Sequence, residues 1–133
     1  MSLVLQDAGT QAVSEWFDRD RRDIALSDFV WGEFVATIGR EIRSKRLTTS
    51  AGERLIERTR SRFDYAAWLL TGADDIAAAT GMVAEFHLGL RLPDAIYLAI
   101  AHRHSATLIT TDKCQANAAA ALGIGYVDPT RLA

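Results

Sequence analysis

Three carboxylate side chains of the 133-residue chain occupy positions that suggest a functional site rather than a hydrophobic core. Glu33 interrupts the apolar stretch FVWGEFVATI, Asp94 opens the apolar segment PDAIYLAIA, and Asp112 directly follows TLITT. A carboxylate among apolar residues costs free energy unless it is paired or binds a cation. If folding gathers the three acids, a hard divalent cation such as Mg²⁺ or Mn²⁺ relieves their repulsion. Such an ion activates a bound water and neutralises charge on a scissile phosphate.

Each acid also has an ordinary structural explanation. Asp94 suits the positive end of a helix dipole, Asp112 can cap the helix that follows it, and Glu33 can pair with an arginine. No CxxC pair or His cluster favours zinc. His102 and His104 are two residues apart on a helix, so they point in different directions. The structural and the chemical interpretations both stay open at this point.

The elements that must position these acids are short apolar strands alternating with helices. We expect one helix beginning near Thr10, another opened by Pro93, and others over residues 28–46, 48–62, 74–86 and 112–122. Buried strands are expected over 23–27, with Ser27 as a helix N-cap, and over 106–110. A final strand is expected over 124–127, and a strand or extended segment over 65–70. In the helix over 28–46 the residues expected to face inward are Phe29, Val30, Phe34, Val35, Ile38 and Ile42.

This order of elements predicts an α/β fold, a three-layer α/β/α sandwich with a mainly parallel central sheet. Sites in that architecture form at the carboxyl ends of the strands. The helix that carries Glu33 follows one expected strand, and Asp112 follows another. Both acids are therefore expected at the edge of the sheet where a site forms.

The amino-acid composition is typical of a folded domain without a membrane-spanning segment. Hydrophobic residues make up 49% and charged residues 24% of the chain, so we expect one folded domain over residues 1–133. No apolar run reaches the roughly 18–20 residues that span a bilayer, so no membrane association is expected. The single cysteine, Cys114, permits no internal disulfide, which favours a cytoplasmic location.

The net charge is −2, but positive charge is concentrated in one segment. Eight of the 15 basic residues lie between residues 40 and 62. They are Arg40, Arg43, Lys45, Arg46, Arg54, Arg58, Arg60 and Arg62. This segment is either a solvated helical face or a rim that faces phosphates.

Three segments of the chain resemble the later motifs of PIN domains. They are LSDFVWGEF around Glu33, LRLPDAIYLAIA around Asp94 and TLITTDKCQANAAAALGI around Asp112. The likeness covers nearly the whole chain in order, with an interval of 18 residues from Asp94 to Asp112. It is greatest toward the VapC-type toxins of bacterial toxin–antitoxin systems. The PDAIYLA and TTD segments are moderately specific together and weak separately.

The resemblance implies an endoribonuclease that depends on Mg²⁺ or Mn²⁺ and cleaves RNA, with tRNA as one candidate substrate. Carried over by position, Glu33, Asp94 and Asp112 are the catalytic acids. Asp94 is then a main metal ligand, Asp112 holds the ion or positions water, and Glu33 binds through water or tunes the site. Thr110 and Thr111 supply hydroxyls near the pocket. The resemblance also implies a homodimer and an antitoxin that fills the acidic groove, often with an arginine.

The N-terminus departs from the family pattern, in which an apolar strand ends in Asp followed by Thr or Ser. In one register SLVLQ is that strand, and Asp7 is the first acid and a further metal ligand. In the other, LVLQDAGTQAV matches the segment beyond the strand, and both the strand and its acid are missing. The local pattern favours the second register, while the need to pair central backbone groups favours the first. Without that acid, the chain would be a catalytically impaired PIN-fold module for dimerisation and for antitoxin or RNA binding.

Overall fold

The computed structural model describes residues 24–131, in which helices and short strands alternate. The elements are β1 (Ala25–Ser27), α2 (Asp28–Arg43), α3 (Thr49–Arg62), β2 (Ala67–Leu69), α4 (Ala73–Ala84), a 3₁₀ turn (Phe86–Leu88), α5 (Leu92–Arg103), β3 (Leu108–Ile109), α6 (Lys113–Leu122), β4 (Tyr126–Val127) and a second 3₁₀ turn (Pro129–Arg131). The helix expected near Thr10 and both alternatives for Asp7 lie outside the described residues.

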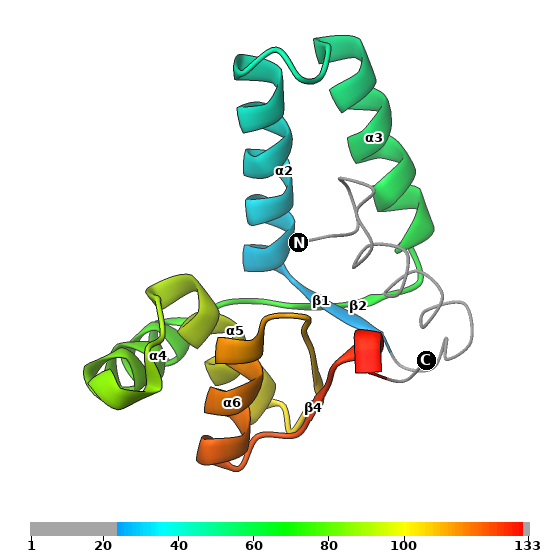
Figure 1. The fold of residues 1–133 in the computed structure, drawn as a ribbon. Helices are drawn as coiled ribbons and strands as arrows, with labels where there is room; N and C mark the ends of the chain where they lie inside the picture. The colour runs from blue at the N-terminus through cyan, green and yellow to red at the C-terminus, as the bar shows by residue number, and fades with distance from the viewer. Residues whose placement is uncertain (1–23, 132–133) are drawn as a thin grey trace.

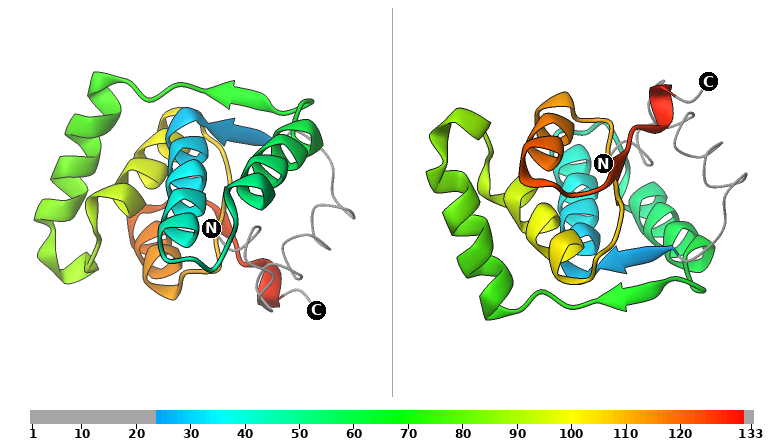
Figure 2. Two further views of the ribbon diagram at one scale, coloured as in Figure 1. Left: turned by 90° about the horizontal axis from the view of Figure 1, so that it is seen from above. Right: turned by 90° about the horizontal axis from the view of Figure 1, so that it is seen from below.

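Strands β1 and β2 lie between two groups of helices (Figure 1). Helices α2 and α3 stand on one side of β1 and β2, and α4, α5 and α6 lie on the other. Seen from above and below, α3 and α4 are at opposite ends of the molecule with α2, α5 and α6 between them (Figure 2). The predicted layering of helices around strands is therefore present.

The strands pair in parallel, as predicted. β1 pairs with β2, placing Leu26 opposite Trp68, and β3 pairs with β4, placing Ile109 opposite Val127. The α/β fold is confirmed, but the strands of residues 24–131 form two pairs rather than one continuous sheet. The two pairs are neighbours, because Leu26 and Ile109 pack on one buried cluster, which consists of Ile24, Phe63 and Ala66.

The strands are shorter and less buried than predicted. Ala25 in β1 is exposed and Leu26 is half-buried, and β3 has only two residues, Leu108 and Ile109, both half-buried. Each strand has one hydrogen-bonded neighbour among the described residues. One edge of each strand is therefore without a neighbouring strand there. The prediction of buried strands over 23–27 and 106–110 is met only in part, since Ser27 and Thr110 are buried but the apolar residues directly before them are half-buried.

Capping residues fix where α2 begins and ends. The Ser27 hydroxyl accepts a hydrogen bond from the Val30 N–H at 3.0 Å, so α2 begins at Asp28 as predicted. The helix ends at Arg43, three residues before the predicted end. Lys45 explains the difference, because its φ of 62° is left-handed and cannot continue a helix.

The other helix limits follow the same logic. Thr48 caps α3 and Pro93 lies in the first turn of α5, as predicted. Asp112 caps α6, and Gly123, with a φ of 72°, ends it. α4 ends at Ala84 rather than at the predicted residue 86, because a 3₁₀ turn replaces its last turn.

Helices α2 and α3 form a hairpin, called here the arm. Buried Phe34 and Ile38 fill its centre, with partly buried side chains around them: Trp31, Ile42, Leu47, Leu55 and Ile56. A Cβ atom at Gly52 would lie 2.7 Å from Ile42 Cδ1 and 2.9 Å from Ile38 Cγ2. The close contact of the two helices therefore requires a glycine at position 52.

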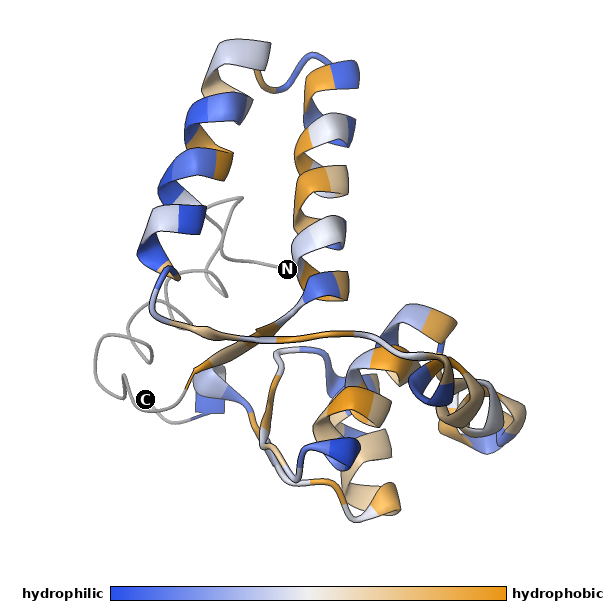
Figure 3. Cartoon of the chain, turned by 180° about the vertical axis from the view of Figure 1, so that it is seen from behind, coloured by the Kyte–Doolittle hydropathy of each residue, from blue (hydrophilic) through white to orange (hydrophobic). Residues whose placement is uncertain are grey.

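The two helices of the arm differ in hydropathy (Figure 3). α3 is mostly hydrophilic, whereas α2 carries a hydrophobic face. Because Phe34 and Ile38 define the inward direction of α2, Val35 is turned away from the centre and is 37% exposed. The prediction that Val35 faces inward is wrong.

Helix α5 is the most buried helix of the body formed with α4 and α6. Its buried residues are Ala95, Ile96, Leu98, Ala99, Ile100 and Ala101, which confirms the buried apolar helix expected after Pro93. At its C-terminal end, Arg103 binds the buried Asp75 of α4 with N–O distances of 2.8 and 2.9 Å. Hydrogen bonding to this guanidinium lowers the pKa of Asp75. No helix within residues 24–131 is long and apolar enough to cross a membrane.

Candidate active site

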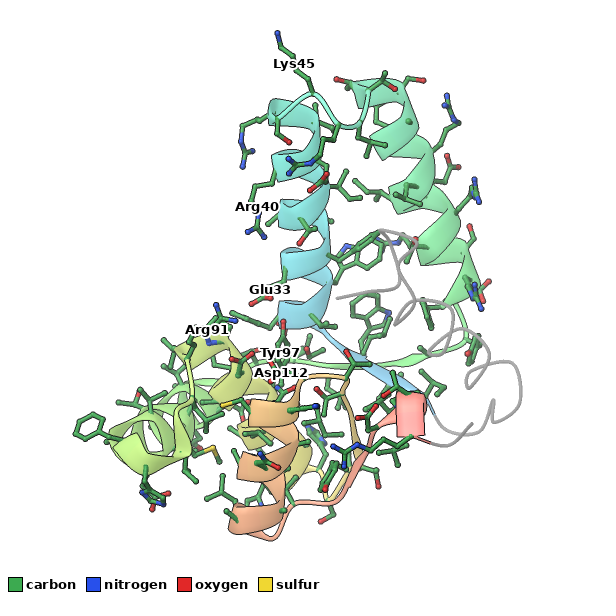
Figure 4. The ribbon with its side chains drawn as sticks, in the orientation of Figure 1. Glu33, Arg40, Lys45, Arg91, Tyr97 and Asp112 are labelled. Atoms are coloured by element: carbon green, nitrogen blue, oxygen red, sulfur yellow. The ribbon has the colours of Figure 1, made fainter. Side chains whose placement is uncertain are left out.

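The predicted acids lie in one region, where the base of α2 is close to the first turns of α5 and α6. Glu33, Tyr97 and Asp112 lie together at this junction, and Arg91 lies beside them (Figure 4). α2 follows β1 directly, and Asp112 comes three residues after the end of β3. Glu33 and Asp112 therefore lie beyond the carboxyl ends of strands, the expected position for a site in an α/β fold.

Glu33 lies beside Tyr97, and within residues 24–131 it forms no salt bridge with an arginine. It is half-buried on α2 and close enough to the Tyr97 hydroxyl on α5 for its charge to act on that hydroxyl. Burial raises the pKa of Tyr97, and the charges of Glu33 and, more weakly, Asp94 raise it further. The hydroxyl thus stays protonated, and it lies close enough to both carboxylates for their charges to affect its pKa. Phe29 holds the Tyr97 ring in an edge-to-face contact with 5.6 Å between centroids.

Asp94 lies in the first turn of α5 and has a loose cationic partner. Arg91 Nε is 3.6 Å from Asp94 Oδ2, three residues apart along the chain. The Arg91 side chain is 83% exposed and that of Asp94 is 22% exposed. An ion pair with this exposure contributes at most about 1 kcal/mol, so a ligand can separate its members.

Asp112 is tied to Asp94 through Gln115. Asp112 Oδ1 accepts the Gln115 N–H at 3.1 Å, and the Gln115 side-chain amide donates to the Asp94 carbonyl, also at 3.1 Å. The Thr110 hydroxyl accepts the Asp112 N–H at 3.0 Å, so Thr110 helps to orient Asp112. Asp112 therefore performs the capping role, and only one of its carboxylate oxygens is used for it.

The structure brings the three predicted acids into one region but not into a closed cluster. Within residues 24–131, no group of three or more His, Cys, Asp or Glu side chains is arranged to hold a metal ion. Asp7, the remaining predicted ligand, lies outside those residues. Thr111 is exposed next to Asp112.

Two residues of the junction, Tyr97 and Gln115, were missed by the sequence analysis. Tyr97 is the only polar side chain between Asp94 and His102, and it lies one helical turn after Asp94. Gln115 is buried in an otherwise alanine-rich helix. A polar residue on the buried face of a helix was the available signal in both cases, because such a group needs a partner.

The basic segment divides according to its contacts. Arg46 forms a bidentate pair with Glu41 at 2.7 and 3.0 Å, and Arg60 lies over the Trp31 ring at 5.8 Å. Both are therefore engaged within the arm. Arg40 instead projects outward from α2, and Lys45 projects from the loop that follows α2; both lie above the junction (Figure 4).

A model of the PIN domain family matches residues 1–121, a range that contains Glu33, Asp94 and Asp112. The chain belongs to the PIN domain family. PIN domains are generally metal-dependent nucleases, so the resemblance seen in the sequence is confirmed at the level of family and fold. No curated protein sequence matches the chain.

The donors at the junction of this PIN domain fit the metals that PIN nucleases use. Glu33, Asp94 and Asp112 offer carboxylate oxygens, which suit hard divalent cations. The thiol of the single cysteine, Cys114, is engaged elsewhere and donates to the Gly89 carbonyl at 3.3 Å. The chemistry of the donor set therefore favours magnesium or manganese over zinc.

Proposed function

We propose that the chain is an endoribonuclease that uses Mg²⁺ or Mn²⁺ to hydrolyse RNA phosphodiester bonds, as the toxin of a VapC-type toxin–antitoxin pair. The observation that carries the proposal is the convergence of Glu33 and Asp94 on Tyr97, with Asp112 joined to Asp94 through Gln115. Membership of the PIN family supplies the class of reaction.

Asp94 and Asp112 are the residues that would hold the ion, and Asp7 would join them in the register that makes it the first acid. Mg²⁺ commonly binds through one or two carboxylates together with waters and substrate phosphates, so a small protein contribution is sufficient. When bound, such an ion activates water and neutralises charge on the scissile phosphate.

Glu33 and Arg91 have complementary roles in this proposal. Glu33 lies beside the Tyr97 hydroxyl, and its carboxylate can accept a hydrogen bond from the attacking water. Arg91 is exposed and loosely paired, so its guanidinium can leave Asp94 and bind a phosphate oxygen of the substrate. Neither role requires the backbone to move.

The ion pair between Arg91 and Asp94 favours a second function. Arg91 already provides Asp94 with a positive partner from the chain itself. A chain that retains this pair would act as a catalytically impaired module for dimerisation and for antitoxin or RNA binding. The contact also supports the proposed antitoxin, because it places a guanidinium at the carboxylate that an antitoxin arginine would occupy. The proposal includes a homodimer in the cytoplasm.

Cleavage of RNA tests the two functions against each other. We expect the chain to cleave total tRNA or other RNA with Mg²⁺ or Mn²⁺, and EDTA to stop the reaction. Asp94→Asn should lower the rate by about 100-fold or more, because it weakens a metal ligand. Asp74→Asn, at an exposed acid in the first turn of α4, is the matched control and should cleave like the unmodified chain.

Equal cleavage by the unmodified chain and Asp94→Asn would remove Asp94 from the mechanism. Calorimetric titration distinguishes the second function. Tight binding of RNA or of a candidate antitoxin, without metal binding and without cleavage, would show the non-catalytic module.

A further inference from the structure

One face of α2 leads away from the acid junction and is polar along its length. Thr37, Arg40 and Ser44 follow Glu33 at intervals of three or four residues, so they share its face of the helix. The Thr37 hydroxyl donates to the Glu33 carbonyl at 2.9 Å and accepts from Arg40 Nη2 at 3.4 Å. The Ser44 hydroxyl donates to the Arg40 carbonyl at 2.9 Å. Lys45 follows in the loop directly after α2. Thr37, Arg40, Ser44 and Lys45 are called here the α2 stripe.

The two cations of the α2 stripe, Arg40 and Lys45, form no salt bridge with the carboxylates of residues 24–131. Arg46, in contrast, forms a salt bridge with Glu41. Both stripe cations are exposed, and both project from the arm above the junction (Figure 4).

We propose that the α2 stripe binds the phosphate backbone of a single-stranded RNA segment beside the scissile bond, with Arg40 as the main phosphate contact and Lys45 as a second. This inference rests on the proposed ribonuclease function. Arg40 is about two turns, or roughly 10 Å, along α2 from Glu33. It therefore contacts a different phosphate from the one at the acids.

The chemistry of the stripe favours backbone contacts over base recognition. Within the described residues the stripe contains hydroxyls and cations but no aromatic side chain on which a base could stack. Trp31 of α2 is turned inward against Phe34. Hydroxyl and arginine contacts to phosphate and sugar position a nucleic acid without reading its sequence. The stripe runs in one line along α2 and the residues directly after it, which suits the backbone of one strand.

Binding measurements on single variants test this proposal. The probe is a fluorescein-labelled single-stranded RNA of about 20 nucleotides, followed by anisotropy in EDTA so that cleavage is stopped. Arg40→Ala should weaken binding about three- to tenfold and reduce the slope of log K against log salt by about 0.7, the value for one lost phosphate contact on a single strand. Lys45→Ala should have a smaller effect in the same direction.

Arg58→Ala is the matched control, because it removes the same charge from an exposed position on α3. We expect its affinity and salt slope to equal those of the unmodified chain. Equal weakening by Arg40→Ala and Arg58→Ala would show that RNA binding depends on the overall positive charge rather than on the stripe. This result would overturn the proposal. Unchanged binding by Arg40→Ala would overturn it too, as would equal affinity for a duplex of the same length.

A separate assay distinguishes failure of the stripe from failure of the nuclease. The small diester bis(p-nitrophenyl) phosphate carries one phosphate, and its hydrolysis by the unmodified chain with Mn²⁺ reports on the acid junction alone. Hydrolysis of this diester together with RNA binding independent of Arg40 would leave the nuclease and overturn the stripe. Arg40-dependent RNA binding without hydrolysis of either substrate would support the stripe and overturn the nuclease.

Discussion

Helix α5 has an aspartate–arginine pair at each end, and the two pairs differ in geometry and exposure. At the C-terminal end, Arg103 makes two hydrogen bonds to Asp75 at 2.8 and 2.9 Å, and the Asp75 side chain is 2% exposed. At the N-terminal end, Arg91 approaches Asp94 only to 3.6 Å, and its side chain is 83% exposed. The same two residue types thus form a closed pair and an open one.

The Arg103–Asp75 pair is structural, whereas a ligand can separate Arg91 from Asp94. Asp75 also accepts the Gly72 N–H at 2.9 Å, and Arg103 also donates to the Leu70 carbonyl at 2.8 Å. These extra contacts offset the cost of burying the carboxylate. Water reaches the Arg91 guanidinium freely, so little free energy holds it in place. One end of α5 is therefore locked, and the other is available for chemistry.

The largest expected effect of breaking these pairs is on stability at the closed end. Arg103→Ala should lower the free energy of unfolding by about 2 kcal/mol, because it leaves the Asp75 carboxylate buried without its partner. Arg91→Ala should change it by less than about 0.5 kcal/mol, since the pair is exposed. Urea unfolding of both variants measures the difference. Equal destabilisation by both changes would refute the distinction between the pairs.

Acid pH should remove the advantage of the closed pair. Because the pKa of Asp75 is lowered in the folded protein, its contribution to stability is complete above the unfolded pKa of about 4. That contribution is lost as pH falls through the lower folded pKa. The gap in unfolding free energy between the unmodified chain and Arg103→Ala should thus be constant from pH 7 to 5 and shrink below pH 4. A gap independent of pH would contradict this account.

The smallest expected effect is at the open pair. Arg91 and a divalent cation compete for Asp94, so Arg91→Ala should raise the affinity for Mg²⁺ or Mn²⁺ about two- to fivefold, the equivalent of about 0.5–1 kcal/mol. Calorimetric titration with MnCl₂ measures it without any substrate. Arg91→Lys keeps the charge and is the control. A fall in affinity for Arg91→Ala would show that Arg91 supports the metal site instead of competing with it.

Local rules predicted much of this molecule. The starts of α2, α3 and α6 follow from Ser27, Thr48 and Asp112, because each cap depends on residues only three positions away. The PIN resemblance likewise rested on short motifs. The Arg91–Asp94 pair, three residues apart on one helix, could have been found in the same way.

Contacts between distant segments could not be predicted from one sequence. Asp75 and Arg103 are 28 residues apart, and each is unremarkable in its own segment. The orientation of Val35 depends on how α3 lies against α2, and the Tyr97 contact to Glu33 depends on how α5 meets α2. Hydrophobic spacing marks the apolar side of a helix but not which neighbour will cover it. The division of the strands into two pairs has the same origin in tertiary structure.

Gly52 sets a dimension of the protein at a distance from any ligand. It lets α3 touch Ile38 and Ile42 on one side of α2, while Arg40 occupies the other side. A larger residue at position 52 would act as a wedge that tilts α2 outward and carries Arg40 with it. One absent methyl group thus fixes how far the arm leans. In the proposed RNA complex, a change at position 52 would therefore weaken binding without replacing any residue of the α2 stripe.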